Sequence, residues 1–240
     1  MNNTKIAIIG MSAHLPSASN INEYWELLSK PRCGLTVFSR NKLIKAGISK
    51  HLINNPNYVP VKGYIDIKNL FDAEAFNIKE KEAFELDPQF RVFLELSDQA
   101  LFSAGYTATK RNHYIIGVYA TGSNLSNRSD LCDAFSNNRF GKYIHAHPSF
   151  IPMYTAYKLN LRGPAISIQS ACSSSLVAVI QACEGLKSGF CDMAIAGGIS
   201  ISYPLVSGYL YEDGFIYSKT GQCRPFTTEN SGIVPSDGGG

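Results

Sequence analysis

Residues 165–180 read AISIQSACSSSLVAVI. The apolar start of this stretch, residues 165–168, predicts a strand, and the apolar run from Leu176 predicts a helix over 173–188. Cys172 lies at the junction, where the first N–H groups of a helix have no backbone partner and the helix dipole favours a thiolate over a thiol. The serines behind it keep the turn small and can cap the helix. These residues alone leave two interpretations open, a nucleophilic cysteine or a buried, inert thiol.

Predicted strands and helices alternate on either side of this junction. Continuous apolar runs predict buried strands at Ile6–Gly10, at 114–120 and at 192–202. Gly10 is not followed by the second glycine and the helix start of a dinucleotide-binding turn, so we exclude that kind of site. The helix over 173–188 is apolar nearly all round and ends at a glycine, which predicts that it is covered on every side. The alternation predicts parallel α/β layers.

Two further helices have recognisable beginnings. Asn20 caps a short helix, whose apolar residues share one face: Tyr24, Trp25 and Leu28. Asp87, followed by a proline, caps a longer helix that ends at Gly105. Its apolar residues recur at helical spacing: Phe90, Phe93, Leu94 and Leu101. We interpret this stripe as core, and Asp87 and Arg91 as helix-start and packing residues without a catalytic role.

Other parts of the chain are less patterned. Residues 30–80 predict irregular structure, with turn signals at 54–57 and at Lys62-Gly63. A polar loop is predicted at 121–129, and the sequence stays weakly patterned to about residue 150. The three glycines at 238–240 are too few to form a linker.

Composition excludes several classes of protein. Charged residues make up 17% of the 240 residues, apolar ones 45%, and the net charge is +3, so we expect a globular chain that binds no nucleic acid. No apolar run is long enough for a membrane span, and no secretory signal is recognisable. The six cysteines form no Cys-x-x-Cys pair, and we expect reduced thiols and a cytoplasmic protein, with Cys183 and Cys191 structural. His145 and His147 have a metal-site spacing without an acidic or thiol partner, so we interpret them as a solvent-facing loop pair.

Motifs along the whole chain together resemble the β-ketoacyl synthase family, above all ketosynthase domains of modular polyketide and hybrid peptide–polyketide synthases. They are IAIIGM at 6–11, NEYWELL at 22–28, LDPQFRVFLE at 86–95, LRGP at 161–164, ACSSSL at 171–176, CDMAIAGG at 191–198 and GQCRPF at 221–226. Each is weak alone, and their order along the chain makes the resemblance specific.

The resemblance implies a thiolase-like layered α/β fold, of which residues 1–240 are the N-terminal half only, without the C-terminal half that carries the catalytic histidines. It implies an acyltransferase of the 3-oxoacyl-[acyl-carrier-protein] synthase type, which extends polyketide or fatty-acyl chains by decarboxylative Claisen condensation. Cys172 would be the acyl-thioester nucleophile, and its own backbone N–H would be one donor to the oxyanion. With the family pattern added, we favour the nucleophile over the inert thiol.

The resemblance also implies partners. The chain would bind no cofactor or metal of its own, since acyl groups arrive on the phosphopantetheine of an acyl carrier protein. Further partners would be the missing C-terminal half, in cis or in trans, and a second copy in a homodimer, but no nucleic acid and no membrane. The five histidines all precede Cys172, and none takes a family histidine's role: His14, His51, His113, His145 and His147. Condensation is therefore incomplete in these residues, and the alternative is a non-condensing module that docks a carrier protein or a partner subunit.

Two further segments can be compared with the family pattern. Residues 147–154 replace the small-polar and basic pattern that the family commonly has before Tyr157, which leaves the selectivity for the acyl chain open. Residues 233–240 look like the family's glycine- and acid-containing loop. Without a second half, the apolar helix over 173–188 would expose one face, so we expect poor solubility of this chain alone.

Overall fold

The computed structural model describes residues 5–30, 32–67, 71–124 and 139–240. They form two compact units. Unit 1 comprises Met1–Ala13, Ile67–Ser200 and Gly239–Gly240, and unit 2 comprises His14–Asp66 and Ile201–Gly238. Since Cys172 belongs to unit 1, that unit is described first.

A sheet forms the centre of unit 1, with the parallel strands in the order β5-β4-β6. The short strand β8 pairs with the other side of β6, and its Gly239 belongs to unit 1. The strands are β4 Ile116–Gly122, β5 Ala165–Ser167, β6 Met193–Ser200 and β8 Gly238–Gly239. Val118 of β4 lies opposite Ala165 on one side and Ile195 on the other. The sequence predicts the three parallel strands, and the structure confirms them within a few residues at each end.

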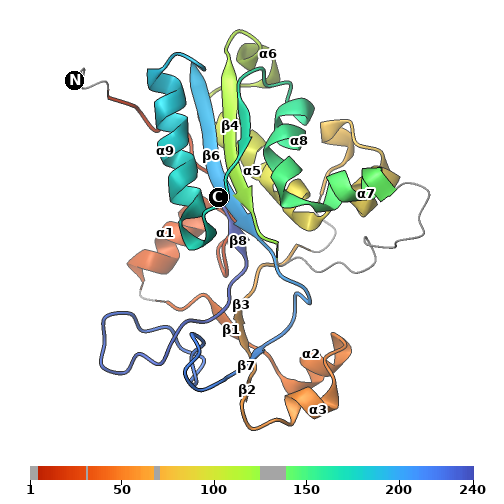
Figure 1. Cartoon of the computed structure of the whole chain (residues 1–240), viewed down its shortest axis with the longest axis vertical. Helices are drawn as coiled ribbons and strands as arrows, with labels where there is room; N and C mark the ends of the chain where they lie inside the picture. The colour runs from red at the N-terminus through yellow and green to blue at the C-terminus, as the bar shows by residue number, and fades with distance from the viewer. Residues whose placement is uncertain (1–4, 31, 68–70, 125–138) are drawn as a thin grey trace. The chain divides into compact units, whose positions relative to one another are not determined.

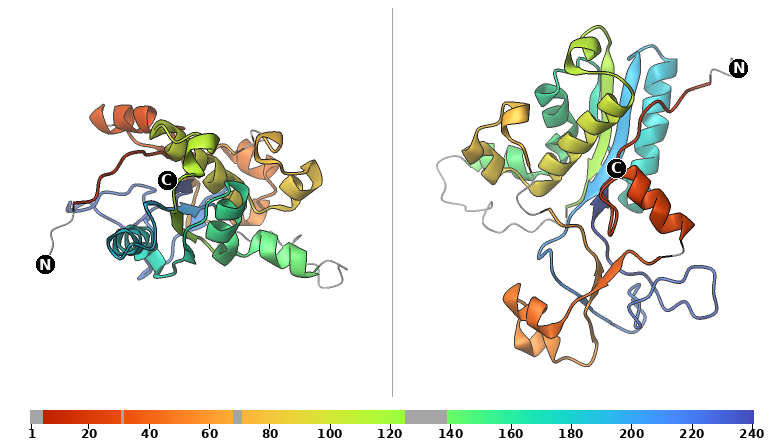
Figure 2. Two further views of the ribbon diagram at one scale, coloured as in Figure 1. Left: turned by 90° about the horizontal axis from the view of Figure 1, so that it is seen from above. Right: turned by 180° about the vertical axis from the view of Figure 1, so that it is seen from behind.

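Helices cover both faces of this sheet (Figures 1 and 2). Helix α9, Ser174–Lys187, packs on one face, where Tyr119 of β4 contacts its small residues. Helices α5, Pro88–Ser103, and α8, Ile151–Lys158, pack on the other face. The shorter helices of unit 1 are η1 Glu74–Phe76, α4 Glu80–Glu85, α6 Ala108–Arg111, α7 Arg139–Ala146, η3 Pro148–Phe150 and η4 Ala171–Ser173.

Helix α5 follows the sequence prediction closely. The side chain of Asp87 accepts a hydrogen bond from the Gln89 N–H at 2.8 Å and caps the helix, and Pro88 occupies its first turn. Gly105, with φ +82°, follows its end. The predicted stripe is buried, since Phe90 and Phe93 are almost inaccessible to solvent. Burial of two phenylalanines stabilises this layer by a few kcal/mol.

Unit 2 consists of short elements. They are α1 Ile21–Ser29, β1 Leu35–Val37, α2 Arg40–Lys45, α3 Lys50–Ile53, β2 Tyr58–Val59, β3 Val61–Gly63 and β7 Tyr209–Leu210. β1 pairs antiparallel with β3, and β2 pairs antiparallel with β7. Asn20 caps α1 as predicted, accepting a hydrogen bond from the Glu23 N–H at 3.0 Å. A small apolar cluster of Val59, Val61 and Tyr209 holds the paired strands together.

Four sequence predictions about secondary structure are wrong. Residues 30–80 are not irregular throughout, because β1, α2, α3, β2, β3 and η1 lie within them. Ile6–Gly10 is not a strand: it pairs with no other segment of the described residues, and Ile8 is exposed. The close packing of Gly10 on α5, where a Cβ would lie 2.3 Å from the Ala100 carbonyl oxygen, fixes this segment instead. Lys62-Gly63 is part of β3 rather than a turn. The weakly patterned residues before 150 contain α7, whereas most of the loop predicted at 121–129 lies outside the described residues.

Among the helices of the described ranges, none combines the length and the apolar character that a bilayer crossing requires.

Candidate active site

Cys172 lies in η4, between the end of β5 and the start of α9. The predicted junction of strand and helix is therefore confirmed. The turn follows the carboxyl end of a parallel strand, which is where open α/β sheets place their ligands. The cysteine is exposed, so the structure contradicts the interpretation as a buried, inert thiol.

Three serine residues build the turn around Cys172. The Ser174 Oγ accepts a hydrogen bond from the Ser170 N–H at 2.8 Å and donates one to the Ala171 carbonyl oxygen at 2.7 Å. The Ser173 Oγ donates to the Ser170 carbonyl oxygen at 2.8 Å. Ser173 is the N-cap residue of α9, but its side chain makes no capping hydrogen bond. The serines thus keep the turn closed, as expected, but they do not cap the helix.

The backbone of the turn leaves one N–H group available. Ala171 has φ +53°, a left-handed conformation that residues other than glycine rarely adopt. Within the described part of the chain, the Cys172 N–H donates no hydrogen bond to a protein group. A free donor beside an exposed thiol is the arrangement that stabilises an oxyanion formed when the thiol attacks a carbonyl.

Glutamine side chains hold the strand end next to this turn. The Gln169 Nε2 donates to the Gly122 carbonyl oxygen of β4 at 3.1 Å. The fully buried Gln89 of α5 makes two hydrogen bonds to the backbone of Ser123, each of 2.9 Å. Sequence reasoning missed both glutamines, because nothing local marks a side chain that bonds to a backbone 34 or 47 residues away.

The other described cysteines have different surroundings. Cys191 is buried against Tyr119 in the cluster under α9, and Cys183 is half-buried, in agreement with structural roles. Cys33 and Cys223 are exposed in unit 2. Cys132 lies outside the described residues.

The interpretation of His145 and His147 as a solvent-facing loop pair is wrong. His145 lies in the last turn of α7 and His147 precedes η3, and both are half-buried. The ring of His145 packs against Tyr154, and the ring of His147 packs against Tyr143. The two histidines therefore do not point freely into solvent. The described residues contain no group of three or more side chains that could hold a metal ion.

A polar network in unit 1 was not predicted. Lys158 of α8 forms an ion pair with Glu82 of α4 at 3.1 Å, and the Tyr154 hydroxyl donates to the same carboxylate at 2.9 Å. Burial acts to raise the pKa of Glu82, but the hydrogen bonds from Lys158 and Tyr154 outweigh it and lower that pKa. Burial and this carboxylate raise the pKa of Tyr154, which stays a neutral donor. The network joins α4 to α8 on the face of the sheet opposite α9.

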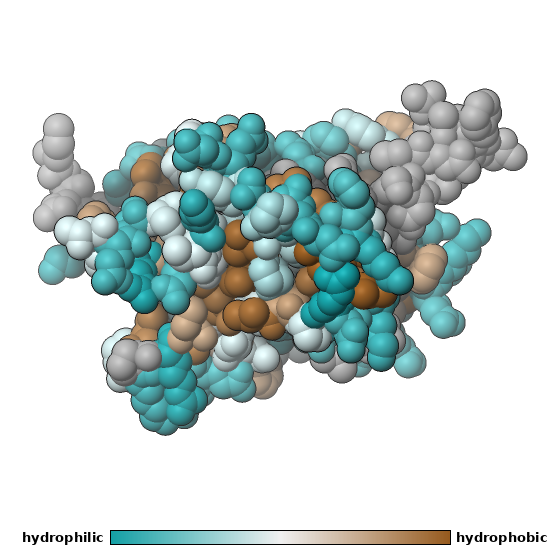
Figure 3. Space-filling model, turned by 90° about the horizontal axis from the view of Figure 1, so that it is seen from below, coloured by the Kyte–Doolittle hydropathy of each residue, from teal (hydrophilic) through white to brown (hydrophobic). Residues whose placement is uncertain are grey.

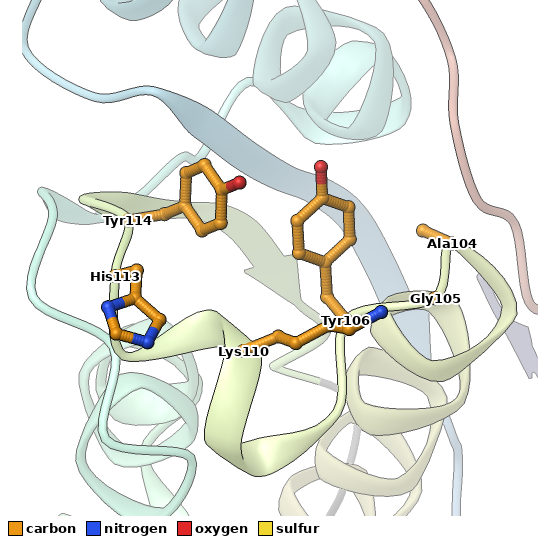
Figure 4. A pocket seen from close by; sticks show the side chains of 6 residues that line it. All are labelled: Ala104, Gly105, Tyr106, Lys110, His113 and Tyr114. Carbon is orange, nitrogen blue, oxygen red and sulfur yellow. The ribbon is translucent and has the colours of Figure 1, made fainter.

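A hollow of about 510 Å³ lies elsewhere in unit 1 (Figure 4). It is lined by Ala104, Gly105, Tyr106, Lys110, His113 and Tyr114. These residues precede the start of β4, whereas the Cys172 turn follows the end of β5, and the two strands are parallel. The hollow therefore lies at the opposite end of the sheet from the cysteine and takes no part in its chemistry.

Helix α9 has an exposed apolar face. Its buried residues are the small ones, Ser174, Ala178, Ala182 and Gly185. Leu176 is 65% exposed and Ile180 is 50% exposed. The prediction that α9 is covered on every side is wrong for the described residues, and the expectation of one exposed face is confirmed. Unit 2 also exposes apolar residues, such as Phe215 and Phe226, and apolar side chains gather between polar ones on the face drawn in Figure 3.

Comparisons with known proteins agree with this geometry. The family model described as "Beta-ketoacyl synthase, N-terminal domain" matches residues 3–240. The chain is 36% identical over 98% of its length to a phenolphthiocerol/phthiocerol polyketide synthase of Mycobacterium tuberculosis, and covers 16% of that protein. It is also 36% identical to the hybrid PKS-NRPS synthetase TAS1 of Cordyceps militaris, over 97% of its length and 14% of that protein.

A solved structure shows the same fold. Ketosynthase twelve from the bacillaene polyketide synthase of Bacillus amyloliquefaciens superimposes with a TM-score of 0.88 at 33% identity, covering 97% of this chain and 41% of that one. The thiolase-like α/β fold predicted from the sequence is thereby confirmed. The chain spans less than half the length of each of these proteins.

Proposed function

Because the chain belongs to the β-ketoacyl synthase family, we propose that Cys172 accepts the acyl group during polyketide or fatty-acyl chain extension. One observation carries the proposal: an exposed thiol and an unused N–H group share a turn at the carboxyl end of a parallel sheet. The helix α9 begins two residues after Cys172, so the unpaired N–H groups of its first turn lie at the same turn.

The first half-reaction is acyl transfer. The Cys172 thiolate attacks the carbonyl carbon of an acyl-phosphopantetheine thioester, and a new C–S bond forms. The carbonyl oxygen carries the negative charge of the tetrahedral intermediate and accepts a hydrogen bond from the Cys172 N–H. The bond to the pantetheine sulfur then breaks, and that thiolate takes up a proton from solvent. The carrier protein that brings the phosphopantetheine is the partner that this step requires.

The second half-reaction is condensation. A carbanion formed by loss of CO₂ from a malonyl-type thioester attacks the acyl-Cys172 carbonyl, and the cysteine leaves as a thiolate. Groups that stabilise the carbanion are needed, and we assign none of the five histidines of residues 1–240 to this role. We infer that residues 1–240 act as the N-terminal half of a ketosynthase, with a C-terminal half supplied in cis or in trans and with a second copy as the dimer partner.

The test uses the native gene product and a short acyl-pantetheine thioester. Peptide mass spectrometry should find the acyl group on Cys172, and Cys172→Ala should reduce labelling to background. Cys223→Ala is the matched control, because Cys223 is also exposed but lies outside the turn, and it should be labelled like the wild type. An acyl group found on another residue, with Cys172 free, would overturn the proposal.

Addition of malonyl-pantetheine separates condensation from acyl transfer. Release of a 3-oxoacyl product supports extension, whereas an acyl-Cys172 that persists with malonyl-pantetheine favours the non-condensing module. The mass of the native product, compared with 26.3 kDa for this chain, then decides whether the second half is in cis.

A further inference from the structure

The residue before Cys172 has an unusual backbone conformation. Ala171 has φ +53°, a left-handed conformation that is strained for a residue with a Cβ. A strained residue persists only where its surroundings hold it. The next N–H along the chain, that of Cys172, donates to no protein group in the described part of the chain.

Ser174 holds the backbone of this turn in place by hydrogen bonds. Its side chain is nearly inaccessible, and both of its hydrogen bonds go to the turn, one from the Ser170 N–H at 2.8 Å and one to the Ala171 carbonyl oxygen at 2.7 Å. The backbone N–H of Ser174 also donates to this carbonyl oxygen. Two donors from one residue therefore fix the Ala171 carbonyl.

The consequence for Cys172 follows from the geometry of the peptide bond. The Ala171 carbonyl and the Cys172 N–H belong to the same planar, trans peptide group, so they point in opposite directions. A carbonyl that is held toward Ser174 therefore directs the Cys172 N–H away from Ser174. Rotation of this peptide would turn the donor away.

We propose that Ser174 is a positioning residue for acyl transfer, acting through the Ala171–Cys172 peptide to keep the Cys172 N–H directed at the oxyanion. The inference rests on the proposed function of Cys172. Both side-chain hydrogen bonds of Ser174 go to Ser170 and Ala171, and its contribution is made when negative charge develops on the carbonyl oxygen of the thioester.

Two reactions of the same thiol test this role in the native gene product. Acyl transfer from a pantetheine thioester forms an oxyanion, whereas alkylation by iodoacetamide displaces iodide at a saturated carbon and forms none. In Ser174→Ala we expect acyl transfer to slow about tenfold, less than the full loss of an oxyanion donor because the Ser174 N–H bond remains. Alkylation should stay within about twofold of the wild type, since the thiol itself is unchanged.

Ser175→Ala is the matched control, because Ser175 is the exposed neighbour on the same helix and makes no hydrogen bond among those described. Both of its reactions should proceed at the wild-type rate. Equal slowing of both reactions in Ser174→Ala would mean a general loss of structure and would overturn the positioning role. An unchanged rate of acyl transfer in Ser174→Ala would overturn it as well.

A second variant keeps the test decisive if Ser174→Ala does not fold. Glycine adopts a left-handed backbone without strain, so Ala171→Gly/Ser174→Ala should keep the turn and recover most of the acyl-transfer rate. A double variant that is alkylated normally but acylated no faster than Ser174→Ala, or not at all, would overturn the inference. A wild-type protein that is alkylated at Cys172 but never acylated would instead overturn the proposed function, and the inference with it.

Discussion

The interior of unit 1 and the interior of unit 2 contain different kinds of interaction. Unit 1 packs helices on both faces of its sheet, and most of its largest fully buried side chains are apolar, such as Phe90, Leu94 and Ile116. Unit 2 has short strands, and an ion pair lies buried within it: Lys62 Nζ is 2.7 Å from Asp237 Oδ2, and both side chains are inaccessible. The difference shows which contacts a local sequence pattern can reveal and which it cannot.

The ion pair in unit 2 is fully supported by further hydrogen bonds. Lys62 also donates to the carbonyl oxygens of Ser202, at 2.9 Å, and Leu205, at 3.4 Å. The other carboxylate oxygen of Asp237 accepts bonds from the Ser202 N–H and hydroxyl, each at 2.9 Å. Three segments of the chain, around Lys62, 202–205 and Asp237, are therefore joined by this ion pair and its hydrogen bonds. A buried pair with this support is costly to break, because the remaining charge has no water to replace its partner.

The largest effect is expected from breaking this pair. Lys62→Met leaves Asp237 buried without its partner and should lower the free energy of unfolding of unit 2 by about 3–5 kcal/mol. Hydrogen exchange read by mass spectrometry, on the dilute 240-residue chain, should show faster exchange in peptides from 58–66 and 201–210 than in those of α5.

A double variant separates the charge from the packing. Lys62→Met/Asp237→Leu removes both charges, so it should recover a large part of the loss. Equal exchange in unit 2 for wild type and Lys62→Met would contradict the view that this pair holds the unit together.

The same contrast explains how much of the structure could be predicted. The elements of unit 1 carry local signals, such as the Asp87 cap, the helical spacing after it and the apolar strands, and the structure has them where the sequence places them. Lys62-Gly63 has the local signature of a turn, and it forms a strand because Asp237, 175 positions away, holds the lysine inside. The position of Cys172 could be predicted because its strand and helix carry such local signals. The glutamine contacts could not, because their partners lie 34 and 47 residues away. The hydrogen bonds of Ser174 are local, to Ser170 and Ala171, but no sequence pattern marks the left-handed backbone of Ala171 beside them.

A half-buried carboxyl group in unit 1 should make the stability of that unit depend on pH. Glu95 of α5 is half-buried, and burial raises its pKa to about 7, with Asp72 adding to the effect and Arg91 opposing it. Its pKa in the unfolded chain is the ordinary one, so the folded chain binds this proton more tightly. The stability contributed by the neutral acid is fully present below about pH 4.5 and is lost as the pH rises through about 7.

Glu95→Gln keeps the shape of the side chain and removes the titration. We expect it to raise the free energy of unfolding by about 1–2 kcal/mol at pH 8, after allowance for solvent screening, and to leave it nearly unchanged at pH 4.5. Urea unfolding of the dilute chain at both pH values measures the difference. If Glu95→Gln changed the free energy of unfolding equally at pH 8 and pH 4.5, Glu95 would have its ordinary pKa and unit 1 would tolerate its charge.

The smallest change in stability is expected on the exposed face of α9, where unit 1 itself departs from the apolar-inside pattern. Ile180 is half exposed, so Ile180→Glu should alter the free energy of unfolding by no more than about 0.5 kcal/mol and should increase the amount of chain left in solution after centrifugation. Ala178→Glu is the matched control, since it places the same side chain on the fully buried face of the same helix and should unfold unit 1.

The same pair of variants in the native gene product tests what covers this face. If the native product consists of residues 1–240 alone, Ile180→Glu should remain harmless there. If a further part of the native product packs on α9, the new carboxylate is buried without a partner, and the loss of stability should approach that of Ala178→Glu. A harmless Ile180→Glu in a much larger product would therefore mean that the rest of the protein leaves α9 open. In that case the second half proposed for condensation would have to act without packing on the helix that follows Cys172.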